Sequence, residues 1–199
     1  MLLLETQYFP NIAWMQLFAK TNEVQIEQFD FYQKQSLRNR CHILGAEKAI
    51  TLSVPILGGR NQKALTKDLR IDNDQRWQQD HRKAIQSCYG KAPFYEYYME
   101  DVVRLIATPY IFLADLNFAI IQQSARWLKW KGQLNTTTAY IPQQLLPTLT
   151  TDERDTTRTK NDNLPYTQVF FDRQPFQSGL SFLDALFCLG PACGEYLRR

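Results

Sequence analysis

The chain has 199 residues, of which 44% are hydrophobic and 22% charged, and its formal net charge is +3. These values are typical of a globular protein, and a chain of this length buries roughly 70% of its unfolded surface. The positive charges form no basic block, which argues against a nucleic-acid partner, and no run approaches the roughly 20 apolar residues of a membrane span. We therefore expect a single domain over residues 1–199. The start of the chain lacks the basic region of a signal peptide, and the four cysteines lack metal-ligand spacing, so we expect reduced thiols and a cytoplasmic location.

The first third of the sequence predicts short strands around one helix. Leu2–Glu5 is a short apolar run, and Glu23–Glu27 alternates apolar and polar residues as a half-exposed strand does. Between them, apolar residues at spacings of three and four, from Ile12 to Phe18, predict a helix. Two extended segments, Arg40–Leu44 and Ala49–Pro55, are joined by a short turn and predict a hairpin.

The remainder of the sequence is mostly helical by pattern. Three helices are predicted: from Asn73 or Asp74 to near Gly90, from Phe94 to Ile106, and from Ile111 to Trp130. Residues 148–163 are polar and nearly free of large apolar side chains, and we interpret them as an exposed excursion, ordered or disordered. Extended structure is expected at Thr136–Ile141 and at Tyr166–Phe171, and one or two short helices in Gly179–Arg199. The fold class that follows is α/β, with helices packed on a mixed sheet that includes the 166–171 strand.

His81 is the most informative single residue. On the helix that ends near Gly90 it shares one face with Trp77, Ile85 and Cys88, so the imidazole points to the core or to a pocket. A histidine held in a pocket can act as general acid or base, whereas a histidine in the core has both nitrogens satisfied by neighbours. The sequence leaves both interpretations open.

Asp184 lies among apolar residues on a C-terminal helical face. A buried carboxylate is costly unless it is paired, so we expect it to meet a cation, with Arg38, Arg40 and His81 as the candidates. A pair with His81 would orient the imidazole for catalysis, and a pair with an arginine would be structural. The third alternative is an Asp184 side chain that faces solvent or caps a neighbouring segment.

Further candidate binding residues lie before the hairpin and after the first strand. Arg38 and Arg40 project to one side of an extended segment and can bind an anionic substrate, unless they form internal or surface ion pairs, while Asn39 faces the other way. Gln7 and Tyr8 follow the first strand, where α/β sheets often bind ligands. We interpret Cys41 as a buried filler, because its neighbour His42 points to the opposite face of the strand. The alternative is a nucleophilic Cys41 that takes His81, from the distant helix, as its base.

No motif indicates a cofactor or a metal. Gly58-Gly59 lacks the lysine of a phosphate-binding loop and the dinucleotide pattern, and neither GxSxG nor HExxH occurs. Two histidines in all exclude a histidine-rich metal centre. We therefore expect a small-molecule substrate, no cofactor and no bound metal.

Four clusters in order along the chain carry a resemblance to a known family. They are Tyr8-Phe9-Pro10; Arg38-Asn39-Arg40 with Ser53-Val54-Pro55; Ile71-Asp72-Asn73 with Trp77, His81, Tyr89 and Ala92-Pro93-Phe94; and Tyr166, Gln168, Phe170, Leu180-Ser181, Asp184, Leu186-Phe187 and Gly190-Pro191. Together they resemble the WbqC-like family. The chain departs from the family pattern at Glu5-Thr6, where members of O-antigen clusters tend to have Gln-Pro, and at Gly179, where Asn is frequent.

The resemblance implies a bacterial protein of cell-surface polysaccharide biosynthesis. It implies aminoacyl (glycine) or acyl transfer to an activated sugar. For such a reaction we expect His81 and Asp184 as the catalytic candidates, with Arg38 and Arg40 holding an anionic substrate. The alternative is a non-catalytic binding or scaffold protein of the same pathway. A pocket that contains His81, Arg38 and Arg40 together would favour catalysis, and wide separation or a saturated ion-pair network would favour the scaffold.

Overall fold

The computed structural model describes residues 1–58, 63–148, 150–155 and 163–199. Its main sheet has four parallel strands in the order β5-β2-β1-β6. Their bounds are β1 (Leu2–Glu5), β2 (Glu23–Glu27), β5 (Gln133–Thr136) and β6 (Thr151–Glu153). A separate antiparallel hairpin consists of β3 (Arg40–Leu44) and β4 (Ala49–Ser53). The α/β class and the hairpin are therefore confirmed.

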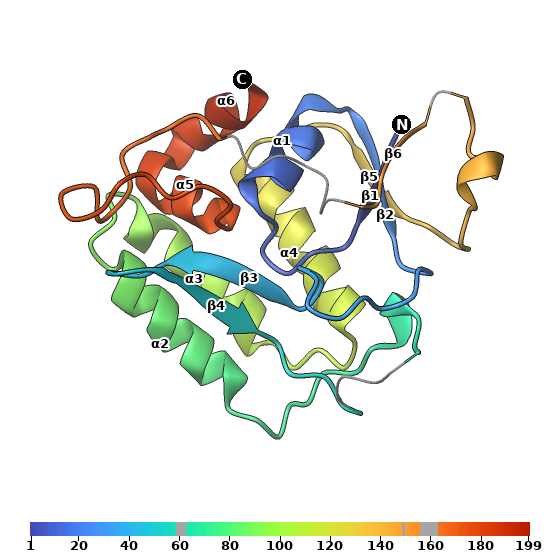
Figure 1. The fold of residues 1–199 in the computed structure, drawn as a ribbon, viewed down its shortest axis with the longest axis horizontal. Helices are drawn as coiled ribbons and strands as arrows, with labels where there is room; N and C mark the ends of the chain where they lie inside the picture. The colour runs from blue at the N-terminus through green and yellow to red at the C-terminus, as the bar shows by residue number, and fades with distance from the viewer. Residues whose placement is uncertain (59–62, 149, 156–162) are drawn as a thin grey trace.

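The helices lie on one side of the sheet and above and below the hairpin in Figure 1. They are α1 (Ile12–Lys20), α2 (Trp77–Tyr89), α3 (Tyr95–Ala107), α4 (Leu113–Trp127), α5 (Phe182–Leu189) and α6 (Cys193–Arg198). Short 3₁₀ turns occur at η2 (Thr66–Asp68), η3 (Gln143–Leu145) and η5 (Gly190–Ala192). None of the helices in the described part of the chain has the length and apolar character that crossing a membrane requires.

The chain forms a β1-α1-β2 unit because each of its parts has a clear local signal. All four residues of β1 are buried, as expected of a central parallel strand that is covered on both faces. Asn11 caps α1 by accepting a hydrogen bond from the Trp14 backbone N–H at 2.8 Å. The Trp14 ring is fully buried, and its Nε1–H donates to the carbonyl of Glu5 at 3.0 Å, which joins the helix to the end of β1.

The hairpin and the helices form a second part of the core on the left of Figure 1, with α1 and α4 between it and the sheet. The predicted buried face of α2 is confirmed, since Trp77, His81, Ile85 and Cys88 are all buried. The helix begins at Trp77 rather than at the expected Asn73 or Asp74, and no side chain caps its N-terminus.

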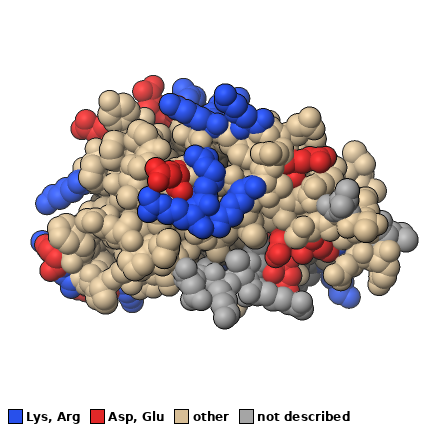
Figure 2. All heavy atoms as spheres, turned by 90° about the horizontal axis from the view of Figure 1, so that it is seen from above, with Lys and Arg blue, Asp and Glu red and all other residues tan. Residues whose placement is uncertain are grey.

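Figure 2 looks down on α6, where Lys and Arg side chains gather with acidic ones beside them.

Two predicted elements are wrong. Residues 166–168 are irregular and residues 169–173 form turns, so there is no 166–171 strand. The fourth strand is instead β6, inside the segment interpreted as an exposed excursion; residues 149 and 156–162 of that segment lie outside the described residues. The expected extended segment at Thr136–Ile141 also falls too late, because β5 ends at Thr136.

Candidate binding site at the carboxyl ends of the strands

The carboxyl ends of the parallel strands bring charged side chains into one row. The register pairs Glu5 of β1 with Glu27 of β2, and Leu4 with Glu153, so Arg154 follows β6 directly beside Glu5. On the other side, Thr137 follows β5 next to Glu27. Two carboxylates on adjacent strands repel each other unless each has its own partner, and the structure supplies one for each.

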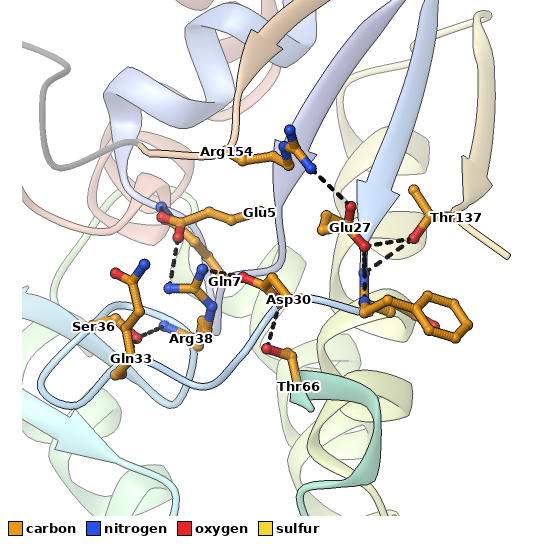
Figure 3. Close-up of polar contacts among 12 residues, drawn as sticks. Glu5, Gln7, Glu27, Asp30, Gln33, Ser36, Arg38, Thr66, Thr137 and Arg154 are labelled. Carbon is orange, nitrogen blue, oxygen red and sulfur yellow. Dashed lines mark hydrogen bonds and ion pairs between the residues drawn. The ribbon is translucent and has the colours of Figure 1, made fainter. Parts of the chain in front are cut away.

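Glu27 is fully buried and its carboxylate is surrounded by donors (Figure 3). Its Oε1 accepts hydrogen bonds from the backbone N–H groups of Gln28 at 3.0 Å and Phe29 at 2.8 Å, and from the Thr137 hydroxyl at 2.9 Å. Its Oε2 lies 3.2 Å from Arg154 Nη1. This complete set of partners compensates for the cost of removing the carboxylate from water.

Arg154 connects β6 to the rest of the sheet. Besides Glu27, it binds Asp152 in a bidentate pair, with Nε to Oδ1 at 2.8 Å and Nη2 to Oδ2 at 2.7 Å. Its Nη1 also donates to the carbonyl of Ile141 at 2.9 Å, and its guanidinium lies 5.0 Å from the centre of the Tyr140 ring. The hydrogen bonds from Arg154 lower the pKa of Asp152 and so keep it ionised.

Arg38 connects the end of β1 to neighbouring parts of the chain, as Arg154 does for β6. Its side chain is only 1% exposed, with Nη1 at 2.8 Å from Glu5 Oε2 and Nη2 paired with Asp30. The Nη1 contact is an ion pair by distance but lies off the hydrogen-bond direction. Asp30 in turn accepts a hydrogen bond from the Thr66 hydroxyl at 2.6 Å, and the backbone carbonyl of Arg38 accepts one from Asn117 at 2.8 Å. Arg38 thus joins β1, the segment after β2 and α4.

A cavity of about 290 Å³ lies over this row, and we call it the sheet-end cavity. It is lined by Asp30, Gln33, Arg38, Tyr140, Gln143, Asp152, Arg154 and Asp155. The cavity lies where β6 and β2 flank β1 on opposite sides, so that the order of the strands reverses there. Ligands of open parallel sheets bind outside the carboxyl ends of the strands at such a reversal, and the sheet-end cavity is therefore the candidate binding site.

His81 does not line this cavity. Its Nδ1 lies 2.9 Å from the hydroxyl of Tyr8, and the ring also forms a hydrogen bond with the backbone of Ser53. Burial lowers the pKa of His81 to about 4, although the Ser53 contact and the charge of Asp80 act in the opposite direction. The imidazole is therefore neutral near pH 7, with both nitrogens satisfied, as in the core interpretation.

Gln7, Tyr8 and Arg40 meet at a different place. They line a crevice with Cys41 and His42 that is too narrow to hold a water molecule. Gln7 nevertheless reaches the row of charges, because its Nε2 donates to Glu5 Oε1 at 3.0 Å. Arg38 and Arg40 therefore do not converge on one cavity.

Asp184 is fully buried, and the expectation that a cation pairs with it is wrong for the described residues. Its Oδ2 accepts hydrogen bonds from the Tyr166 hydroxyl and from Gln168 Nε2, the latter at 2.9 Å. Burial raises the pKa of Asp184, and the hydrogen bonds from Tyr166, Gln168 and Tyr89 oppose that shift. It does not orient His81, which has Tyr8 and Ser53 as partners.

Asn39 and Cys41 have structural environments. The Asn39 side chain donates to the carbonyl of Val54 at 2.9 Å and accepts from the Tyr32 hydroxyl at 3.1 Å, which closes the base of the hairpin. Cys41 is buried, and burial raises its pKa well above that of a free thiol. His42 points away from it and pairs with Thr51 across the hairpin at 3.0 Å, as the alternation along a strand predicts.

Sequence reasoning missed most of the sheet-end cavity. Glu5 and Glu27 each end a predicted strand, and that shared position was the available signal for a polar row. Asp152 and Arg154 could not be predicted as part of this site, because their segment has no apolar periodicity that would indicate a strand. Within the described residues, no group of three or more His, Cys, Asp or Glu side chains is arranged to hold a metal ion.

The comparisons with known proteins give one match. A family model described as the WbqC-like protein family matches residues 6–154, which is well over half of the chain. This range contains Arg38 and Arg154 and three of the four sequence clusters, and it ends before the fourth. No curated protein and no solved structure matches the chain. On the family match, the chain belongs to the WbqC-like protein family.

Proposed function

We propose that this protein is an enzyme of bacterial surface-polysaccharide biosynthesis that transfers an acyl or aminoacyl group to an activated sugar. Its substrate binds in the sheet-end cavity. The pathway and the reaction class rest on what the resemblance to WbqC-like proteins implies, and membership of that family supports them. The location of the site rests on the structure alone.

The single observation that carries the proposal is the cavity at the strand-order reversal. Its volume of about 290 Å³ lies near the lower end of the roughly 300–1,000 Å³ range of small-molecule sites. Its walls contain both donors and acceptors, held by side chains with several partners each, such as Arg154 and Asp30. Such preorganised polar groups fix the orientation of a small polar ligand.

The reaction needs a group that accepts a proton. A hydroxyl or amine of the acceptor sugar forms the new bond to the acyl carbon, the donor's leaving group departs with the bonding electron pair, and the proton of the nucleophile passes to a base. The exposed carboxylate of Asp155, which lines the cavity, is the candidate for this base. We assign His81 and Asp184 to maintenance of the fold, because their polar partners are protein groups outside the cavity.

One observation favours the alternative function, a binding or scaffold protein without catalysis. His81, Arg38 and Arg40 do not share a cavity, and Arg38 is ion-paired with two carboxylates inside the protein. A protein of this kind would bind the same sugar in the sheet-end cavity and release it unchanged. The two functions differ only in whether a product forms.

The test is a thermal-shift screen of the full chain against nucleotide sugars, aminoacyl donors and coenzyme A thioesters, followed by mass spectrometry of mixtures. We expect a nucleotide sugar to raise the melting temperature in proportion to the logarithm of its concentration at saturation, as mass action requires. An added acyl donor should then yield a sugar of increased mass. Binding without a product would establish the scaffold function instead.

Two exposed glutamines provide matched variants for the location of the site. Gln143 lines the cavity, and its neighbour Gln144 is exposed but does not. We expect Gln143→Ala to weaken the ligand-induced shift at least threefold in apparent affinity, and Gln144→Ala to leave it unchanged. If both variants bind the ligand like the wild type, or if nothing in the screen binds, the sheet-end cavity is not the substrate site.

A further inference from the structure

We propose that the sheet-end cavity binds the uncharged, hydroxyl-bearing sugar ring of the substrate and not a phosphate group. This inference rests on the proposed function and adds which part of the substrate the cavity takes. The sequence had suggested the opposite, with two arginines that bind an anion. Three features of the cavity support a sugar ring.

The first feature is the charge balance. Three carboxylates line the cavity, Asp30, Asp152 and Asp155, against the two guanidinium groups of Arg38 and Arg154. Two more carboxylates lie directly behind the wall and are ion-paired with the same arginines, Glu5 with Arg38 and Glu27 with Arg154. Each guanidinium therefore already has two carboxylate partners: Arg38 pairs with Glu5 and Asp30 (Figure 3), and Arg154 pairs with Glu27 and Asp152. A phosphate would enter a site with an excess of negative charge, at a Coulombic cost.

The second feature is the mixture of donors and acceptors. A hydroxyl group both donates and accepts, so it can donate to a carboxylate of Asp152 or Asp155 and accept from an amide such as Gln33 or Gln143. The lining therefore offers both kinds of hydrogen-bond partner to the hydroxyl groups of a sugar ring.

The third feature is an aromatic ring at the rim. Tyr140 is 51% exposed, and the guanidinium of Arg154, 5.0 Å from the ring centre, holds it in place. Partly exposed aromatic rings offer an apolar face together with a polar tip. A sugar ring presents C–H groups on its faces and hydroxyl groups at its edge, so it fits a site with one aromatic wall and several polar ones. An ammonium ligand would use the acidic excess and the Tyr140 face, but it offers no acceptor to the amide groups of Gln33 and Gln143.

The experiment is two-dimensional ¹H–¹⁵N NMR of the full chain, titrated separately with three kinds of probe. They are methyl glycosides of glucose, galactose and N-acetylglucosamine, inorganic phosphate, and glycinamide. We expect at least one glycoside to shift the side-chain amide signals of Gln33 and Gln143 in a saturable way at millimolar concentration. Phosphate and glycinamide should leave these signals in place. The glycoside affinity should change less than twofold between 50 and 300 mM salt, because no net charge is brought in.

Variants of two exposed aspartates provide the control. Asp155 lines the cavity and Asp74 lies outside it, before α2. We expect Asp155→Asn to lower the glycoside affinity at least threefold and Asp74→Asn to have no effect. If phosphate or glycinamide shifts the cavity signals and no glycoside does, the inference is wrong and the cavity remains the substrate site. If neither these probes nor the activated sugars shift any cavity signal, the inference and the proposed site both fail.

Discussion

At the scale of single residues, the pair formed by Tyr8 and His81 shows how a motif can belong to the core. Tyr8 is fully buried, and its hydroxyl lies 2.9 Å from His81 Nδ1. Burial lowers the pKa of His81 to about 4 in the folded protein, so the folded state favours the neutral imidazole. In the unfolded chain the pKa of His81 has its ordinary value of 6.5. Above pH 6.5 the imidazole is neutral in both states, and this contribution to stability is complete. As the pH falls from 6.5 towards 4, only the unfolded state takes up the proton, and the contribution is lost.

The pH dependence of unfolding should therefore carry a His81 component. We expect the free energy of unfolding to fall by about 3 kcal/mol more between pH 7 and pH 4 in the wild type than in His81→Gln. Urea denaturation at a series of pH values measures the difference, in which the other titrating groups cancel. His42→Gln should remove a smaller component of the same sign, because burial and the charge of Arg40 also lower the pKa of the partly exposed His42. Parallel curves for wild type and His81→Gln would contradict this account of the imidazole.

The Tyr8 hydroxyl can be removed without a change in shape. Tyr8→Phe leaves His81 Nδ1 without its partner in a buried site, and we expect a loss of about 1–3 kcal/mol in the free energy of unfolding. Tyr97→Phe is the control, because Tyr97 is 82% exposed, and it should change stability by less than about 0.5 kcal/mol. Equal effects of the two substitutions would show that the Tyr8–His81 contact contributes nothing.

At the scale of elements, Arg38 connects the end of β1 to the segment after β2. Removal of one partner from a buried ion pair leaves the other charge uncompensated. Arg38→Met leaves the carboxylates of Glu5 and Asp30 without their cation, so we expect it to lower the free energy of unfolding by roughly 3–5 kcal/mol. Arg104→Met tests the same chemistry on the surface, where the Arg104 side chain is 66% exposed and pairs with Asp101 within α3. We expect that variant to lose at most about 0.5 kcal/mol in urea denaturation. A small loss at Arg38 would indicate that the carboxylates find other partners.

The edge strand β6 depends on a side chain for its place in the sheet. It has only three residues, and Arg154 links it to Glu27 on β2 and to the carbonyl of Ile141. We expect Arg154→Leu to speed amide hydrogen exchange in residues 151–153 at least tenfold while β1 stays protected. Arg126→Leu, at the exposed end of α4, should leave the exchange of β6 unchanged. Exchange that rises equally in all strands would mean that Arg154 supports global rather than local stability.

At the scale of the whole molecule, the sheet-end cavity joins parts of the chain that are far apart in sequence. Its walls come from residues 30–38, 140–143 and 152–155, and Asn117 of α4 holds the backbone of Arg38 from behind. A ligand there should therefore stabilise the molecule as a unit. At one hundred times its dissociation constant we expect a gain of about 2.7 kcal/mol. Urea denaturation should show a higher midpoint with an unchanged slope, and a changed slope would instead indicate partial unfolding.

Elements with a strong local pattern could be predicted from the sequence alone, and so could the family. Alternation predicted β2 and the hairpin, and helical spacing predicted the buried face of α2, including His81. These predictions succeeded because the period of apolar residues reflects which face of one element is buried. The glycine of Gly190-Pro191 has a local reason in its φ of +56° and a tertiary one in the Phe94 ring, which would lie 2.5 Å from an added Cβ.

The order of the strands and the candidate site could not be predicted in this way, because both depend on packing between distant segments. The partner of Asp184, the place of β6 and the division of Arg38 and Arg40 between two sites depend on contacts between distant parts of the chain. β6 has three polar residues, so no period marks it, and its pairing with β1 and the Arg154 contacts hold it in the sheet. Charged residues at strand ends look like solvent-exposed residues in a sequence. They form a site here because parallel strands bring their carboxyl ends to one edge of the sheet.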